Sequence, residues 1–235
     1  MILNLFRGKL VCAVFCACAS MTAATHAATL ECRRPDSLGM LRQEIVQHIV
    51  NAEASRDDDG RIVVYQLPGD DGGGRFEIAG INERYHPEMA AHLRGLIDAG
   101  AHAQAEAEAV AYIADYTDRY ALRAKTGAIR YLLRDLTWNR GWTGAVRILQ
   151  IALQVPEDGV FGPQTFVALR QHERQPLKLI GALRVAREIY ERRRRDENSR
   201  FWNGLVNRWD AASRRARCFF RDGVGVSPQP GKVPR

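Results

Sequence analysis

The stretch that decides the fold covers residues 41–81 and reads LRQEIVQHIVNAEASRDDDGRIVVYQLPGDDGGGRFEIAGI. Its first part places Leu41, Ile45 and Ile49 four residues apart. This spacing puts the three side chains on one face of an α-helix. We therefore expect an amphipathic helix over residues 36–54, which the polar segment that follows brings to an end.

Two β-prone runs come after this helix, at residues 61–67 and 75–81. Both are rich in the branched and aromatic residues that favour strands. Between them, residues 68–74 read PGDDGGG, a combination that forms turns. The sequence thus predicts one small β-hairpin over residues 61–81.

The remainder of the chain has helical periodicity almost to its end. Pro87 suits the first turn of a helix, and Gly100 suits a helix stop. Further helical segments are expected over residues 101–121, 126–137, 142–153, 163–172, 176–195 and 199–217. The predicted fold class is mainly α and of the α+β type, a helical domain with one small β-hairpin.

Residues 1–27 have the pattern of a secretory signal peptide. Arg7 and Lys9 precede an apolar run at residues 10–21, and small residues lead to Ala27. The run is too short to cross about 30 Å of hydrocarbon as a helix. We expect cleavage near Ala27, a periplasmic or secreted protein, and no integral membrane segment after cleavage.

Two cysteines, Cys32 and Cys218, remain after the signal is removed. In an oxidising compartment two thiols suggest one disulfide, and two unpaired, buried thiols are the alternative. Two cysteines with scattered histidines cannot build a four-ligand zinc site, and the histidines lack the HExxH spacing of zinc peptidases. The sequence therefore predicts no metal and no cofactor.

The charge balance points to an anionic partner. The full chain has a net charge of +7, and removing Arg7 and Lys9 with the signal leaves +5. Outside the cytoplasm, a positive excess favours cell-wall polymer or a membrane surface over nucleic acid. Basic runs such as residues 192–195 could equally form a solvated helix face.

Glu53 is the residue with the clearest chemical potential. It continues the row of Leu41, Ile45 and Ile49, at a position where another apolar residue would be expected. A partly desolvated carboxyl is disfavoured in its charged form, as a general acid working near neutral pH requires. The alternative is a carboxylate at a helix end that points into water.

The hairpin adds further carboxyl groups close to Glu53. Asp70 and Asp71 lie in its turn, and Glu77 lies on the strand face opposite to its apolar neighbours. Cleavage of a glycosidic bond usually takes two carboxyl groups about 5–9.5 Å apart. Glu53 could form such a pair with one of the three, although Asp70 and Asp71 also suit an ordinary turn.

These motifs resemble the glycoside hydrolase family 108 N-acetylmuramidases, lysozyme-like proteins with a C-terminal peptidoglycan-binding segment. The family's Glu-Gly-Gly helix end corresponds to residues 53–55, and its Asp-x-Gly-Gly stretch to residues 70–74, followed by Gly80. The matching motifs of the second half are Asn139-Arg140-Gly141, Leu149-Gln150, residues 158–165, Arg187 with Tyr190, and residues 201–208. The resemblance extends over residues 41–217.

The resemblance implies cleavage of the β-1,4 bond between N-acetylmuramic acid and N-acetylglucosamine, with Glu53 as general acid. It implies a lysozyme-like catalytic part at residues 28–137 and a helical peptidoglycan-binding part at residues 138–218, and a disordered tail is expected at residues 223–235. The candidate catalytic residues are Glu53 and Asp71, with Asp70 and Glu77 as alternatives to Asp71. The candidate substrate-binding residues are Tyr65, Asn139, Gln150, Arg187 and Tyr190.

A second hypothesis is a non-catalytic peptidoglycan-binding or adaptor protein derived from a lysozyme-like fold. The family's two glycines are Ala54 and Ser55 here, and its threonine falls at Phe76 or Glu77, which favours this alternative. The retention of Glu53 beside an acidic turn favours the hydrolase. Peptidoglycan glycan strands are the expected partner in both cases, and the sequence names no immunity or secretion partner.

Overall fold

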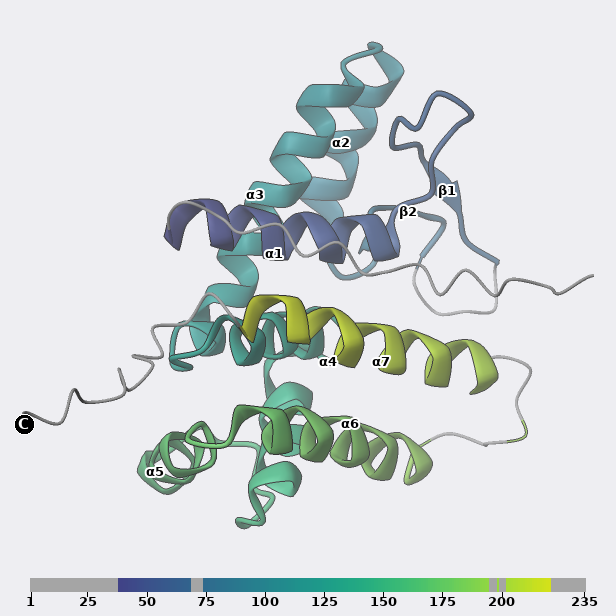
Figure 1. The fold of residues 1–235 in the computed structure, drawn as a ribbon. Coiled ribbons are helices and arrows are strands. Elements are labelled where there is room, and N and C mark those ends of the chain that lie inside the picture. The colour runs from purple at the N-terminus through teal and green to yellow at the C-terminus, as the bar shows by residue number, and fades with distance from the viewer. Residues whose placement is uncertain (1–37, 69–73, 195–197, 199–201, 221–235) are drawn as a thin grey trace, which may run out of the picture.

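The structure is a computed structural model that describes residues 38–68, 74–194, 198 and 202–220. The helices are α1 (Leu38–Glu53), α2 (Pro87–Asp98), α3 (His102–Ala121), α4 (Gly127–Leu153), α5 (Pro163–His172), α6 (Pro176–Arg192), α7 (Trp202–Ala216) and the 3-10 helix η1 (Arg217–Phe220). The strands are β1 (Tyr65–Gln66), β2 (Phe76–Ile78) and β3 (Ile81–Asn82). The fold is thus mainly helical with one small sheet, which confirms the predicted fold class (Figure 1).

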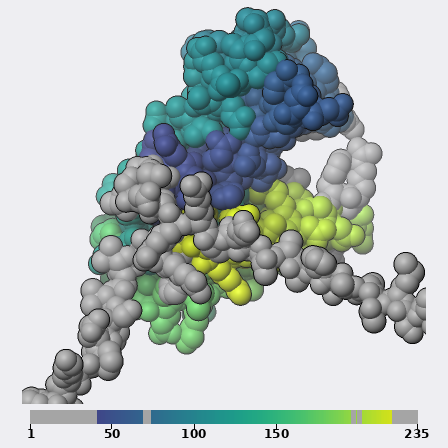
Figure 2. Space-filling model, turned by 45° about the horizontal axis from the view of Figure 1, so that its top comes forward, coloured from purple at the N-terminus to yellow at the C-terminus, as the bar shows by residue number. Residues whose placement is uncertain are grey.

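Helix α1 has the predicted amphipathic character. Leu41, Ile45 and Ile49 are all buried, and the helix ends at Glu53. In the space-filling view, α1 lies between the surface of α2 and α3 and that of α7 (Figure 2). This position brings the end of α1 close to residues from both halves of the chain.

The sheet has three antiparallel strands in the order β1-β2-β3, where the sequence pattern indicated a single hairpin. The second β-prone run folds back on itself at Ala79 and Gly80, which have φ angles of 52° and 76°. Ile78 then pairs with Ile81 across this tight turn. The strands are also shorter than predicted, because residues 61–64 form only an isolated bridge between Arg56 and Ile62.

Helix α4 joins two segments that the periodicity predicted separately. It runs through Gly141, whose φ of 64° and ψ of 177° interrupt the helical geometry. The break lies between the predicted segments at residues 126–137 and 142–153, so both are confirmed as helical. Helix α5 has the predicted bounds, starting at Pro163 in its first turn.

Helix α4 is the centre of the packing and contacts α1, α3, α5, α6 and α7. Buried residues from both predicted parts, such as Ile49 and Leu183, belong to one hydrophobic core. The predicted boundary between residues 137 and 138 lies inside α4. The division into a catalytic and a peptidoglycan-binding part therefore stays a prediction.

Several expectations concern segments outside the described residues, namely the signal peptide at residues 1–27, Cys32 and the tail at residues 223–235. Cys218 is buried in η1, and its predicted pairing with Cys32 stays a prediction. Among the helices of the described residues, none combines the length and the apolar composition needed to span a membrane.

Candidate active site

The carboxyl group of Glu53 is held by two side chains from the second half of the chain. Arg208 of α7 forms an ion pair with Oε1 through its Nη2 atom, and Nδ2 of Asn139 in α4 donates to Oε1 at 3.4 Å. The side chains of Glu53 and Arg208 each keep 21% of their surface exposed. Both contacts fall on one oxygen, and within the described residues Oε2 has no hydrogen-bond donor.

Behind this pair, acidic and basic side chains alternate into the interior of the protein. Oδ1 of Asp135 accepts a hydrogen bond from Arg208 at 2.9 Å, and Oδ2 accepts one from Arg187 at 2.6 Å. Burial alone would raise the pKa of Asp135, but Arg208 and Arg187 hold it below its usual value. Asp135 is therefore ionised and fixes the guanidinium of Arg208 toward Glu53. We call the residues Glu53, Arg208, Asp135 and Arg187 the charge chain.

The turn between β2 and β3 lies directly against this site. A Cβ atom built on Gly80 would be 2.9 Å from Nε1 of Trp138 and 3.3 Å from the Cβ of Glu53. Only a residue without a side chain allows such a close approach. The small sheet, the end of α1 and the middle of α4 therefore meet at Gly80.

The change Gly80→Ala is expected to destabilise the protein and to displace Glu53. The positive φ costs a non-glycine residue about 1–2 kcal/mol, and the contact with Trp138 adds to this. Gly60→Ala is a matched control, because Gly60 has a φ of 78° but no atom within 4 Å of the added Cβ. Urea unfolding of both variants checks the expectation, and equal losses of unfolding free energy would contradict it.

Trp138 also belongs to a line of aromatic rings. Its ring stacks on His86 with centroids 5.3 Å apart and meets Tyr116 edge-on at 5.6 Å. Tyr116 in turn stacks on Trp142 at 5.1 Å, and Trp142 is 38% exposed. We call His86, Trp138, Tyr116 and Trp142 the aromatic row. It leads from the neighbourhood of Glu53 to the surface.

Of the other predicted catalytic carboxyls, Asp70 and Asp71 lie outside the described residues. Glu77 lies in β2 between two buried residues, so it occupies the outer face of the sheet. Tyr65 of β1 is the direct partner of Glu77, and side chains of directly opposed residues share one face. Tyr65 and Glu77 therefore lie side by side on the outer face, where Tyr65 is exposed.

The candidate substrate-binding residues fall into two groups. Asn139 contacts Glu53, and Tyr65 is exposed on the sheet. In contrast, Gln150, Arg187 and Tyr190 are buried, at 1%, 3% and 8% exposure. These three buried side chains support the structure in this conformation. Of the five candidates, Asn139 and Tyr65 are the ones open to a ligand.

Gln150 organises the motif at residues 158–165. Its Nε2 donates to Oδ1 of Asp158 at 2.6 Å, and its Oε1 accepts from the backbone N–H of Gly159 at 2.8 Å. A further hydrogen bond joins Nε2 to the hydroxyl of Thr165 at 3.1 Å. The amide of Gln150 thus links α4 to the turn that precedes α5.

We expect Gln150→Leu to lower stability without removing the activity of the folded protein. The change removes the acceptor of the Gly159 N–H and the bonds from Nε2 to Asp158 and to the buried hydroxyl of Thr165, at a cost of about 1–3 kcal/mol. Gln104→Leu is the control, because the bond of Gln104 to Glu108 lies on the exposed face of α3. Thermal unfolding compares the two, and a loss for Gln104→Leu as large as that for Gln150→Leu would argue against this role.

Sequence patterns did not assign a role to Asp135, Trp138, His86 or Arg208. A signal existed for two of them: Asp135 interrupts an apolar run in α4, and Arg208 lies in the matched motif at residues 201–208. A charge inside an apolar helical run indicates a buried partner. His86 and Trp138 gave no signal, because nothing in the sequence brings them together.

This arrangement is suited to proton transfer and to the stabilisation of charge. The carboxylate of Glu53 is partly exposed, and one of its oxygens is bound by a guanidinium and an amide. Aromatic rings lie alongside. No group of His, Cys, Asp or Glu side chains able to hold a metal ion is found in the described part of the chain.

A mainly helical framework, with a small antiparallel sheet beside a helix that ends in a carboxylate, defines the lysozyme-like α+β class of fold. The chain is similar in structure to SagA of Brucella abortus, with a TM-score of 0.58 and 22% sequence identity over 80% of this chain and 100% of that one. No protein-family model and no curated protein matches the sequence. At this identity the likeness shows the fold, and the function has to be argued from the site.

Proposed function

We propose that the protein is a peptidoglycan hydrolase that cleaves the β-1,4 bond between N-acetylmuramic acid and N-acetylglucosamine. The observation that carries the proposal is the geometry of Glu53. Its Oε1 is fixed by Arg208 and Asn139, whereas Oε2 lacks a donor among the described residues. One carboxyl oxygen is therefore left to meet the glycosidic oxygen of a bound strand.

In the proposed mechanism, Glu53 donates a proton to the leaving oxygen. A second carboxylate stabilises the developing positive charge or activates water. Asp71 is the first candidate for this role, with Asp70 and Glu77 as alternatives. Glu77 lies on the outer face of the sheet beside Tyr65, where a glycan strand could contact both.

The ion pair with Arg208 places a condition on this mechanism. The guanidinium of Arg208 occupies Oε1 of Glu53, so the proton has to be delivered from Oε2, or Arg208 has to move when the strand binds. Asp135 also binds Arg208, so Arg208 keeps a second carboxylate to hold it if it moves away from Glu53.

The proposed substrate fits the charge of the protein and its proposed place in the periplasm or outside the cell. Peptidoglycan carries peptide carboxylates, and the chain has a net charge of +7, or +5 once the expected signal with Arg7 and Lys9 is removed. Tyr65 and Asn139 are the proposed substrate contacts. Tyr65 is exposed, and Asn139 contacts Glu53.

Digestion of purified peptidoglycan tests the proposal. The protein is incubated with insoluble peptidoglycan, and the soluble fragments are identified by mass spectrometry after borohydride reduction. We expect fragments that end in reduced N-acetylmuramic acid. Fragments that end in N-acetylglucosamine or in an anhydro sugar would assign a different bond or a different chemistry.

The second candidate function is a non-catalytic peptidoglycan-binding or adaptor protein. The engagement of Glu53 with Arg208 favours it, because the guanidinium occupies one oxygen of the carboxyl group that would have to serve as the acid. In the digestion experiment this candidate predicts sedimentation of the protein with peptidoglycan and no soluble fragments.

A further inference from the structure

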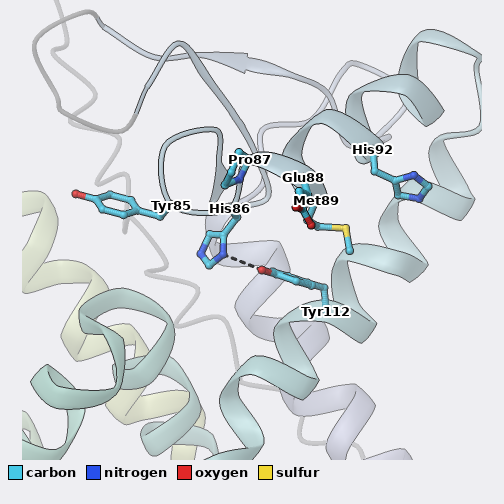
Figure 3. Close-up of a pocket in the computed structure, with 7 residues that line it drawn as sticks. All are labelled: Tyr85, His86, Pro87, Glu88, Met89, His92 and Tyr112. Carbon is cyan, nitrogen blue, oxygen red and sulfur yellow. Dashed lines mark hydrogen bonds between the residues drawn. The ribbon is translucent and has the colours of Figure 1, made fainter.

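An open pocket of about 490 Å³ lies beside the aromatic row. It is formed by residues 85–89 together with His92 of α2 and Tyr112 of α3. Figure 3 shows the ring of Tyr112 reaching toward His86, whose Nδ1 lies 2.9 Å from the Tyr112 hydroxyl. The volume falls within the range of about 300–1,000 Å³ that is usual for ligand sites.

The pocket is connected to Glu53 through Trp138. On the pocket side, Trp138 stacks on His86, which lines the pocket. On the side of Glu53, Nε1 of Trp138 and the side chain of Glu53 both lie close to Gly80. Glu53 and the pocket are therefore neighbours, separated by Gly80 and the stack of Trp138 on His86, and a strand of several sugars bound at Glu53 is long enough to reach the pocket.

The lining combines apolar faces with polar groups at their edges. Pro87, Met89 and the rings of His86 and Tyr112 provide the apolar part. Tyr112 and Tyr85 carry hydroxyl groups, and Glu88 and His92 add an acceptor and a ring nitrogen. Aromatic side chains of this kind offer an apolar body and a polar tip to the same ligand.

This chemistry matches a neutral sugar ring. A pyranose has an apolar face of C–H groups that packs on an aromatic ring, and a rim of hydroxyls that bonds to polar groups. An N-acetyl substituent adds a methyl group for Met89 or Pro87 and an amide for the polar edge. The negative charge of Glu88 disfavours an anionic ligand at this point.

From this lining and its connection to Glu53 we infer that the pocket is a saccharide subsite, which holds one N-acetylated sugar of a β-1,4-linked strand at a distance from the bond that is cleaved. The identity of the strand as peptidoglycan rests on the proposed function. The binding of the sugar itself needs no catalysis, so the two can be tested apart.

The test measures binding of tetra-N-acetylchitotetraose to the full chain carrying Glu53→Gln, by isothermal titration calorimetry. Tyr85→Ala and His92→Ala are added one at a time, since both side chains are exposed, at 67% and 51%, and neither is needed for the core. Loss of the Tyr85 ring is expected to raise Kd by about two- to tenfold, the usual size of an aromatic contact. Phe166→Ala is the matched control, an exposed aromatic residue on α5 for which no change is expected.

Two results would overturn the inference. One is no binding of the tetrasaccharide by the Glu53→Gln protein, and the other is an equal Kd for Tyr85→Ala and for the Phe166→Ala control. Digestion of peptidoglycan by the parent protein is scored separately. Binding that depends on Tyr85, without any digestion, would support the subsite and reject the hydrolase. Digestion, with no effect of Tyr85 or His92 on binding, would support the hydrolase and reject the subsite.

Discussion

Replacing Glu53 by glutamine is expected to lower the release of soluble fragments from peptidoglycan by a factor of about 10²–10⁴, the usual contribution of a positioned general acid. Glutamine keeps the size of the side chain and still offers an oxygen to Arg208 and Asn139. It cannot deliver a proton to the leaving oxygen. The measurement is the initial rate of new reducing ends, with the melting temperature recorded to show that the variant is folded.

Two companion variants make this result specific. Glu188→Gln removes a carboxylate of α6 that pairs with Arg184 and Arg192 and should leave the rate unchanged. Glu77→Gln asks whether the sheet supplies the second carboxyl group, and a loss of similar size would assign that role to Glu77. A Glu53→Gln protein as active as the parent would remove Glu53 from the mechanism.

The second large effect concerns stability. Asp135→Ala is expected to reduce the free energy of unfolding by about 3–5 kcal/mol, because it breaks a buried ion pair by removing one partner. Arg187 would remain buried at 3% exposure without its carboxylate, and among the described residues Arg208 would keep Glu53 as its ion-pair partner. Urea unfolding measures the loss. Asp115→Ala is the control, since its pair with Arg42 is on the surface and is worth about 0–1 kcal/mol.

Asp135 should also make part of the free energy of unfolding depend on pH in the acidic range. The pKa of Asp135 is lowered on folding from the ordinary value of 3.8, so the folded state favours the ionised form. This contribution is present above pH 3.8 and is lost as the pH falls below that value through the folded pKa. Asp135→Asn should flatten the loss of stability in this range, and an unchanged slope would show that other carboxyl groups cause it.

Much of the fold could be predicted because its signals are local. The row of Leu41, Ile45 and Ile49 fixed the buried face of α1, and Pro163 marked the start of α5. The third strand could not be predicted from the sequence, because the turn before it includes Ala79 at a φ of 52°. Alanine seldom adopts this conformation, so the run at residues 75–81 looked continuous.

The site could be predicted only in part, for a related reason. Glu53 stood out because it interrupts a local pattern, but Arg208 lies 155 residues further along and meets it only through the packing of α7. His86 and Trp138 are likewise joined by tertiary structure alone. A motif match also does not say whether a residue touches the ligand or supports the fold, as the buried Gln150 and Arg187 illustrate.

The distance along the chain between Glu53 and Arg208 has a consequence for synthesis. A ribosome adds about 5–20 residues per second, so Arg208 follows Glu53 after roughly 8–30 s. Throughout that interval the nascent chain contains Glu53 but not the Arg208 side chain that pairs with it. The site is therefore assembled last, and a chain that stops before α7 has no means of completing it.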